Sequence, residues 1–318
     1  MDKELNGIPG ISDKIDSLKS NIKKHIKGKD SVIDNCLCAL FSNGHVLIED
    51  IPGVGKTTLA HTIALSINLD FKRIQFTSDL LPSDIIGVSV FDQNQKEFVF
   101  KKGPVFSNII LADEINRTTP KTQSSLLEAM NESSVTVEGN RYELEAPFMV
   151  IATQNPFEYH GTFPLPESQL DRFAIRLSMG YPDRESEKTI LSDKNRSRHE
   201  ETVMPVISAE ELKAIQEAVE NVHIEGEVLD YLLAIVDKTR NSEIFELGVS
   251  PRGAIILKKL AMARAVLENR DYCLPDDVKN MVVPAFSHRV VLRNSTSAGS
   301  GGESEALTNL LREVTVPL

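Results

Sequence analysis

The sequence predicts an α/β domain built on a parallel sheet, followed by a helical domain, and three observations predict this arrangement. Short apolar runs typical of buried strands alternate with helical segments through the first half of the chain. A glycine-rich loop separates the first apolar run from the helical segment after it. Strand-like runs disappear from about Tyr181 onward. We therefore expect a sheet with helices on both faces over residues 1–182 and an all-α domain over residues 183–318.

The elements of the first domain are predicted from their hydrophobic periodicity. Residues 1–44 are expected to be helical, because Ile11, Ile15, Leu18, Ile22 and Ile26 share one helical face. Further elements follow in order: strands at 45–49, 71–76, 108–112 and 148–153, and helices at 57–68 and 119–131.

Two segments interrupt the alternation of strands and helices. Val88–Phe100 and Val135–Leu144 each carry alternating residues around a polar turn, a pattern that predicts a β-hairpin. Both hairpins are expected as insertions into the α/β core. The sequence leaves open whether they only decorate the surface or contact a substrate.

The second domain is predicted from helical signals alone. Ser208 and Glu211 form a capping box before apolar residues at helical spacing, and 252–269 is a second long helical pattern. The serine- and glycine-rich stretch 295–302 is expected to be a flexible connection before a last short helix.

Composition excludes several classes of protein. The 318 residues are 41% hydrophobic and 25% charged, as in an ordinary globular chain, and carry a net charge of −11. That negative charge argues against a protein whose main task is binding the nucleic acid backbone. We see no run long enough to cross a membrane and no signal-peptide stretch after Met1, so we expect a cytoplasmic protein without membrane insertion. The three cysteines are expected to be buried free thiols.

A phosphate-binding loop is predicted between the first strand and the following helix. Glycines let successive backbone N–H groups point at phosphate oxygens, and the helix adds its positive N-terminal end. Lys56 would reach the β- and γ-phosphates, and the Thr57 hydroxyl would ligate Mg²⁺. The complete pattern has glycine at position 50, where this chain has Asp50, so the turn geometry at the loop entrance departs from the pattern. The predicted nucleotide contacts are Pro52, Gly53, Val54, Gly55, Lys56, Thr57 and Thr58.

Polar residues at the ends of two later strands complete a hydrolytic site. Asp113 and Glu114 end the run at 108–112, where Asp113 can hold Mg²⁺ and Glu114 can polarise an attacking water. Asn155 follows the run at 148–153. Because parallel strands bring their carboxyl ends to one rim, Asn155 could bond the γ-phosphate or the water.

Two arginines are candidates for stabilising charge on the transferred phosphoryl group. Arg172 follows Asp171 before an apolar run and could serve as an arginine finger. Arg252 lies in the first turn of a helix opened by Ser250 and Pro251, where its charge could be aimed at phosphate.

These motifs, taken in order, resemble the MoxR family of AAA+ ATPases. The resemblance covers about residues 10–318 and rests on the P-loop together with Gly103-Pro104-Val105-Phe106, Leu111-Ala112-Asp113-Glu114-Ile115-Asn116-Arg117, Leu126-Leu127-Glu128-Ala129-Met130, Ala152-Thr153-Gln154-Asn155-Pro156, Gly161-Thr162-Phe163-Pro164-Leu165-Pro166-Glu167, Gln169-Leu170-Asp171-Arg172-Phe173 and Val249-Ser250-Pro251-Arg252-Gly253. Apart from Asp50, the chain departs at Lys29, where relatives tend to carry glutamine.

The resemblance implies a P-loop AAA+ core with an α-helical lid, assembled as a ring that is commonly a hexamer. It implies that Asn155 is sensor 1, Arg252 is sensor 2, and Arg172 is a finger acting on ATP of the neighbouring subunit. Residues near Gly28 would flank the adenine, and the two hairpins would match the helix-2 and pre-sensor-1 inserts of this clade. Family members are thought to act as chaperone-like remodellers, often with a partner that carries a von Willebrand factor A domain.

Three functions are compatible with these motifs. The favoured one is an Mg²⁺-dependent ATPase that remodels or matures partner protein complexes. A nucleic-acid motor of the same clade is the first alternative, although Lys101-Lys102 is the only obvious basic spot beside a hairpin. A nucleotide-gated scaffold with negligible turnover is the second, and the intact Glu114, Asn155 and Arg172 argue against it.

Overall fold

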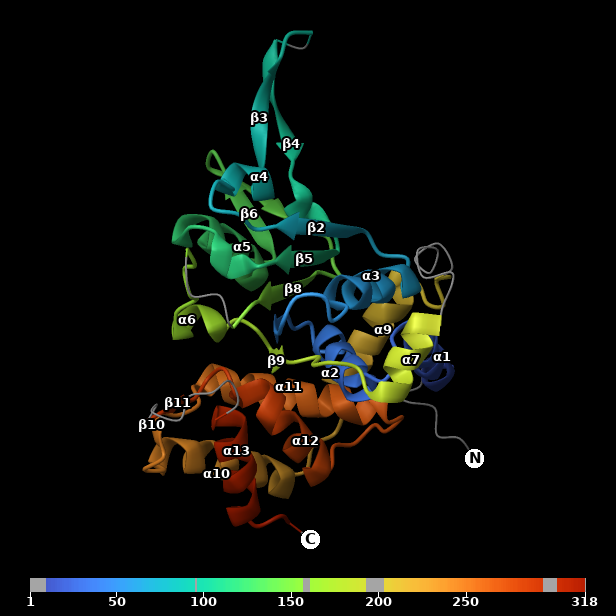
Figure 1. The fold of residues 1–318 in the computed structure, drawn as a ribbon, viewed down its shortest axis with the longest axis vertical. Helices are drawn as coiled ribbons and strands as arrows, with labels where there is room; N and C mark the ends of the chain where they lie inside the picture. The colour runs from blue at the N-terminus through green and yellow to red at the C-terminus, as the bar shows by residue number, and fades with distance from the viewer. Residues whose placement is uncertain (1–9, 95, 157–160, 193–202, 294–301, 318) are drawn as a thin grey trace.

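A five-stranded parallel sheet forms the centre of the protein (Figure 1). The computed structural model describes residues 10–94, 96–156, 161–192, 203–293 and 302–317. Neighbouring strands pair in parallel throughout. The spatial order of the strands is β2 (Phe71–Gln75), β5 (Ile109–Asp113), β8 (Met149–Gln154), β1 (Val46–Glu49) and β9 (Ile175–Leu177). The predicted parallel sheet is confirmed.

Helices cover both faces of this sheet. Alternate residues of each strand point to opposite faces, so they belong to two separate hydrophobic cores. In β1, Val46 and Ile48 pack into one core and Leu47 into the other. The first core is covered by α1 (Ile11–His25), α2 (Asp30–Phe41) and α3 (Lys56–Ser66). The second is covered by the short helix α4 (Pro82–Ile86), the 3-10 turns η2 (Pro104–Phe106) and η3 (Ile115–Arg117), and α5 (Pro120–Glu132).

The predicted N-terminal helical region consists of two helices, α1 and α2. The five isoleucine and leucine positions predicted for one face are all buried. The break comes at Gly28, whose φ of 67° is in the left-handed region that favours glycine. Residues 1–9 of the predicted segment lie outside the described residues.

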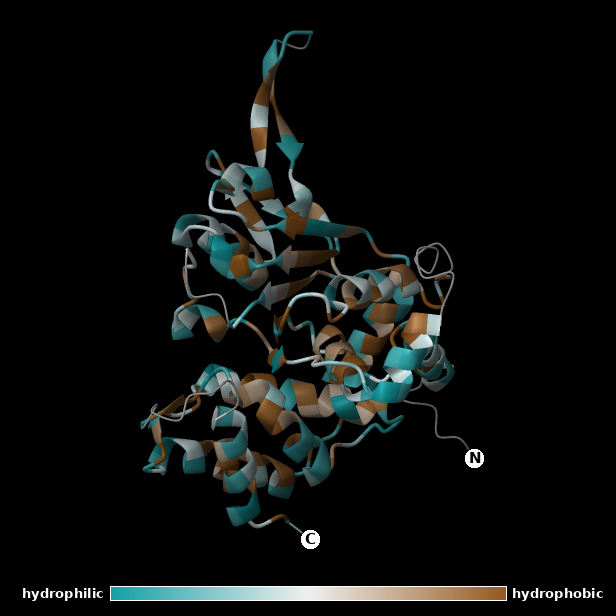
Figure 2. Ribbon diagram, viewed as in Figure 1, coloured by the Kyte–Doolittle hydropathy of each residue, from teal (hydrophilic) through white to brown (hydrophobic). Residues whose placement is uncertain are grey.

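Both predicted hairpins are present. They consist of β3 (Gly87–Asp92) with β4 (Glu97–Lys102), and β6 (Ser134–Val137) with β7 (Asn140–Glu143), each antiparallel. The β3–β4 hairpin projects from the body of the protein and carries hydrophobic residues along its length (Figures 1 and 2). Phe91 and Phe98 pair across it, edge to face, with ring centroids 5.3 Å apart. The Ser89 hydroxyl donates to the Glu138 carboxylate at 2.8 Å, which ties the two hairpins together.

The C-terminal part is helical, with one addition that the sequence analysis did not predict. A two-stranded antiparallel ribbon joins β10 (Phe245–Leu247) to β11 (Val291–Leu292), so this part is not strictly all-α. Strands of three and two residues are too short to show periodicity. The remaining elements are α6 (Glu167–Leu170) before β9, and then α7 (Arg184–Ser192), α9 (Ala209–Glu220), α10 (Gly226–Asn241), α11 (Pro251–Leu267), α12 (Pro275–Phe286) and α13 (Gly302–Glu313).

The C-terminal helices pack on the α1–α3 side of the sheet. Side chains of α2, α9, α11 and α12 belong to one continuous hydrophobic core. The Gln216 amide also donates to the Leu40 carbonyl at 2.8 Å. The predicted capping box is confirmed by reciprocal bonds between Ser208 and Glu211. The boundary near residue 182 stays a prediction, and residues 295–301 of the predicted flexible connection lie outside the described residues.

Two further predictions concern single residues and the membrane. Cys36, Cys38 and Cys273 are free and buried, as expected. Within the described ranges, we find no helix that is both apolar and long enough to span a bilayer.

A buried histidine joins the amino end of β1 to its neighbours. His45 Nε2 donates to the Met130 carbonyl at 3.0 Å, and its Nδ1 accepts the Val150 N–H at 3.1 Å. The bond accepted at Nδ1 requires the neutral ring, because a protonated ring has a donor at both nitrogens. Burial lowers the pKa of His45 to about 4.

We predict that His45→Gln weakens the acid sensitivity of folding. Between pH 6.5 and pH 4 the unfolded chain binds a proton at His45 that the folded chain does not, so wild-type stability falls as the pH falls through this window. As the pH falls from about 7.5 to 5.5, His45 alone should lower the free energy of unfolding by about 1 kcal/mol. Urea unfolding at the two pH values measures this loss of unfolding free energy. Equal losses in the variant and the wild type would show that His45 is not its source.

Candidate nucleotide-binding site

The P-loop lies between β1 and α3 with the backbone geometry that the sequence predicts. Gly53 and Gly55 have φ angles of 85° and 99°, which non-glycine residues rarely adopt. Helix α3 begins at Lys56, directly after the loop, so its unpaired N–H groups face the loop. The Lys56 ammonium folds back and donates to the Asp50 carbonyl at 2.8 Å. The loop is thus open to a phosphate, with its lysine held at the loop entrance.

The two carboxylates at the end of β5 are fixed by a residue from the neighbouring strand. The Thr153 hydroxyl donates to Asp113 Oδ1 at 2.7 Å and accepts the Glu114 N–H at 2.9 Å. Glu114 has a φ of 59°, so the chain turns sharply there. Thr153 therefore sets the relative position of Asp113 and Glu114.

Strand β2 contributes two side chains that the sequence analysis missed. Arg73 forms an ion pair with Asp113 Oδ2 at 2.6 Å, and the Gln75 amide donates to Glu114 Oε2 at 2.8 Å. Arg117 reaches the same Glu114 oxygen at 3.1 Å. The alternation of β2 places Arg73 and Gln75 on one face, but only the pairing of β2 with β5 brings that face to the carboxylates.

The P-loop lysine lies within electrostatic reach of these acids. Burial lowers the pKa of Lys56, while the charges of Asp50, Asp113 and Glu114 act in the opposite direction. Asn155 is buried directly after β8, the strand between β5 and β1. The predicted loop, acid pair and asparagine thus meet at the carboxyl edge of the sheet, where ligands bind in open α/β folds.

The residues at this edge fit a magnesium ion. The Thr57 hydroxyl at the start of α3 and the Asp113 carboxylate are oxygen donors, the type that Mg²⁺ prefers. Asp113 Oδ2 is paired with the Arg73 guanidinium, so a metal ion would compete with that cation for the oxygen.

Asp50, the departure from the P-loop pattern, anchors the loop entrance to the segment after β9. Its Oδ2 accepts the backbone N–H groups of Met179 and Gly180 at 2.5 and 2.6 Å, and the Ser178 hydroxyl at 3.1 Å. Its Oδ1 accepts the Ile51 N–H at 2.8 Å. The buried carboxylate is therefore fully compensated by donors, and we call residues 178–181 the connector because they lead from β9 toward α7.

The turn between α1 and α2 holds the connector from the other side. Lys29 donates to the carbonyls of Met179 and Tyr181, the second at 2.8 Å. Gly28 packs so closely on the start of α7 that a Cβ there would come within 2.4 Å of the Ser186 hydroxyl. Gly28, the P-loop entrance and the connector thus form one wall beside the P-loop.

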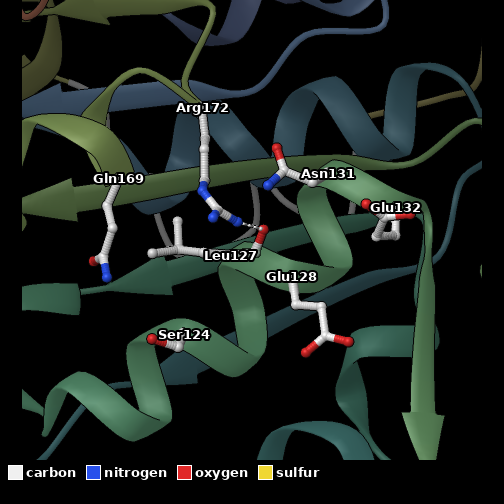
Figure 3. A pocket seen from close by; sticks show the side chains of 7 residues that line it. All are labelled: Ser124, Leu127, Glu128, Asn131, Glu132, Gln169 and Arg172. Carbon is white, nitrogen blue, oxygen red and sulfur yellow. Dashed lines mark hydrogen bonds between the residues drawn. The ribbon is translucent and has the colours of Figure 1, made fainter.

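The two predicted arginines lie together at the opposite edge of the sheet. Arg172 precedes β9, and its guanidinium donates to the Leu127 carbonyl of α5 at 2.7 Å (Figure 3). Arg252 donates to the Asn131 side chain, near the end of the same helix, at 2.6 Å. Burial lowers the pKa of Arg172, and the nearby charge of Arg252 lowers it further. We call Arg172 and Arg252 the arginine pair.

A pocket of about 320 Å³ lies beside this pair. Figure 3 shows Arg172 in it above α5, with Glu128 and Asn131 on the helix. The Nε of Arg172 is buried and has no hydrogen-bond partner among the residues that the structure describes. The lining residues are Ser124, Leu127, Glu128, Asn131, Glu132, Gln169 and Arg172.

Arg252 lies beside the amino edge of β1 and β9, and the expectation that its charge is aimed at phosphate stays a prediction. His45, whose carbonyl accepts the Ala174 N–H at 2.8 Å, marks the amino edge of β1 and β9, and the Arg252 charge acts on His45. The P-loop follows the carboxyl end of the same strand β1. The sheet therefore separates the arginine pair from the P-loop of this chain.

Comparisons with known proteins agree with this architecture. Residues 45–175 match the ATPase family associated with various cellular activities (AAA), and residues 237–309 match the AAA lid domain. Chaperone MoxR1 of Mycobacterium tuberculosis is 35% identical over 98% of this chain and 85% of its own length. The chain belongs to the MoxR family of AAA+ ATPases.

Three other proteins are also similar to this chain. The uncharacterized protein YeaC of Bacillus subtilis is 48% identical over 94% of this chain and 93% of its own. Protein MoxR of Methylorubrum extorquens is 28% identical over 85% of each chain. The crystal structure of a proposed ATPase from Cytophaga hutchinsonii superposes with a TM-score of 0.88 at 37% identity, covering 97% of this chain and 96% of that one.

We predict that Asp50→Gly, which restores the usual P-loop glycine, destabilises this MoxR-family protein. The substitution leaves the connector N–H groups of Met179 and Gly180 without their acceptor, at a cost of about 1–3 kcal/mol. The stability of Asp50→Asn, which keeps one side-chain oxygen as an acceptor, should lie between those of the wild type and Asp50→Gly. Thermal melting and titration with a fluorescent ATP analogue measure stability and binding; an Asp50→Gly variant that melts higher and binds tighter would refute this role.

Proposed function

We propose that this chain hydrolyses ATP to ADP and phosphate at interfaces between copies of itself and uses the energy to remodel partner proteins. The observation that carries the proposal is the separation of two half-sites on opposite edges of one sheet. The P-loop, Asp113, Glu114 and Asn155 lie at the carboxyl edge, and the arginine pair lies beside the amino edge. One copy therefore supplies the nucleotide-binding edge and the next supplies the arginines.

The arrangement of the arginine pair favours binding of an anion from outside the chain. Two guanidinium groups repel each other, and the repulsion is relieved when a phosphate approaches both. The buried Nε of Arg172 has an unused donor that a phosphate oxygen would satisfy. Arginine fingers delivered by a second protein accelerate phosphoryl transfer by about 10³–10⁵.

At the carboxyl edge, the residues divide the work of hydrolysis. Lys56 leaves the Asp50 carbonyl to bind the β- and γ-phosphates, and the N–H groups of the loop hold their oxygens. Glu114 accepts a proton from the attacking water once Gln75 and Arg117 release its Oε2, and Asn155 orients the water or the γ-phosphate. Thr57 and Asp113 would hold Mg²⁺, which would neutralise phosphate charge.

We infer that the assembly is a ring, with six copies as the family resemblance implies, and that it acts in the cytoplasm. Chaperone MoxR1 is named for activity on other proteins, which favours a protein client for this chain, with a von Willebrand factor A domain protein as a candidate partner. The projecting β3–β4 hairpin supports client contact, because Phe91 and Phe98 expose 50% and 71% of their surface. The net charge of −11 disfavours nucleic acid as the client.

We predict that Glu114→Gln lowers the ATPase rate at least about 100-fold while ATP still binds. Glutamine keeps the size of the side chain but cannot take the proton of the attacking water. Lys56→Ala is the matched variant, since it should weaken binding as well as turnover. Phosphate release and fluorescent-nucleotide titration measure the two effects; wild-type turnover in the Glu114→Gln variant would exclude Glu114 as the base.

We predict that Arg172→Ala alone keeps only a small residual ATPase rate but regains activity when mixed with Glu114→Gln. In a mixed assembly, the intact nucleotide edge of the first variant meets the intact arginine of the second. Specific activity of the wild type should also rise with protein concentration as assemblies form, which mass measurements of the same samples follow. A mixture no more active than its two components would exclude a finger supplied between subunits.

A further inference from the structure

A buried arginine from the C-terminal helical part holds the segment that carries Arg172. Arg289 follows α12, and only 1% of its side chain is exposed. Its Nε forms an ion pair with Asp171 Oδ1 at 2.7 Å. Its Nη2 donates to the carbonyls of Asp171, at 3.0 Å, and Phe173, and its Nη1 donates to Ala174 at 3.1 Å. One guanidinium thus forms hydrogen bonds with the chain on both sides of Arg172.

The chemistry of this contact points to positioning rather than to simple packing. Burial lowers the pKa of Arg289 to about 10, and the Asp171 carboxylate opposes that effect. Burying a charge is costly unless it is paired and fully hydrogen-bonded, and an apolar side chain could fill the same space at lower cost. What the planar guanidinium adds is a fixed geometry between the carbonyls that it joins.

The same aspartate reaches the helix that carries Arg252. Asp171 Oδ2 accepts the Ser250 hydroxyl at 3.3 Å, and Ser250 caps α11 by accepting the Gly253 N–H at 3.1 Å. A Cβ at position 253 would lie 2.9 Å from Arg289 Cδ, so glycine leaves room for the buried arginine. Asp171 therefore links Arg289, the start of α11 and, through the chain, Arg172.

We propose that Asp171 and Arg289 are positioning residues that set the arginine pair as one unit and couple it to the C-terminal helices. Neither residue touches the nucleotide of its own chain, because both lie with the arginine pair at the amino edge of the sheet. A shift of α11 and α12 moves Arg172 and Arg252 together. The inference rests on the proposed function, in which this pair serves the neighbouring copy.

The first test is ATPase kinetics of Arg289→Met. We expect kcat to fall about tenfold or more, while the affinity of the variant for a fluorescent ATP analogue changes less than about twofold, since its P-loop is untouched. In the Arg172→Ala background, whose residual rate a sensitive phosphate assay follows, Arg289→Met should lower kcat by a smaller factor than in the wild type, because part of its effect acts through Arg172. Additive losses would assign Arg289 a structural role only and would overturn the proposal.

A matched control separates positioning from general stabilisation. Arg270 forms a bidentate pair with Asp277 at 2.7 Å for both bonds, also within the C-terminal helices. Arg270→Met should lower the melting temperature but keep kcat.

If Arg289→Met does not fold, a double variant serves in its place. Arg289→Met combined with Asp171→Asn removes both partners and leaves no buried charge unpaired. Equal loss of kcat in the Arg270 variant and in the Arg289 variant would overturn the proposal.

Mixing experiments distinguish failure of this inference from failure of the proposed function. Arg289→Met mixed with Glu114→Gln should regain activity, as should Arg172→Ala mixed with Glu114→Gln. Recovery with the Arg172 variant but not with the Arg289 variant overturns the positioning role and leaves the shared site intact. Recovery with neither overturns the shared site, and the inference falls with it.

Discussion

Parallel pairing of the five central strands is the constraint on which the functional layout depends. Because all strands run in one direction, the residues that follow β1, β5 and β8 gather at one edge, and the residues that precede β9 gather at the other. The P-loop and the acid pair occupy the first edge. The arginine pair occupies the second, so the fold itself places these two groups of residues on separate surfaces of the chain.

Both edges are tied to the C-terminal helices by charged side chains. At the nucleotide edge, Asp50 and Lys29 hold the connector that leads to α7. At the arginine edge, Arg289 and Asp171 hold the segment before β9. The same helical part is therefore attached to both edges by polar contacts, and it also shares a hydrophobic core with α1–α3.

The sequence could predict the features that are contiguous along the chain. The P-loop, the acid pair and Asn155 follow apolar runs directly, so strand ends place them. Contacts across strands could not be predicted in this way: Arg73, Gln75 and Thr153 reach the acid pair only because β2, β5 and β8 are adjacent, an order that chain sequence does not give. Arg289 lies 118 positions from Asp171, and no local pattern relates the two.

The contacts at the connector have a consequence for how this chain can evolve. Asp50 accepts mainly backbone N–H groups, Lys29 donates to backbone carbonyls, and Arg289 donates mostly to backbone carbonyls as well. Backbone groups are present whatever side chain stands at the position, proline aside. The side chains of the hydrogen-bonded segments can therefore be substituted while these contacts to the backbone are kept. We expect sequence covariation among relatives to identify few partners for these three residues.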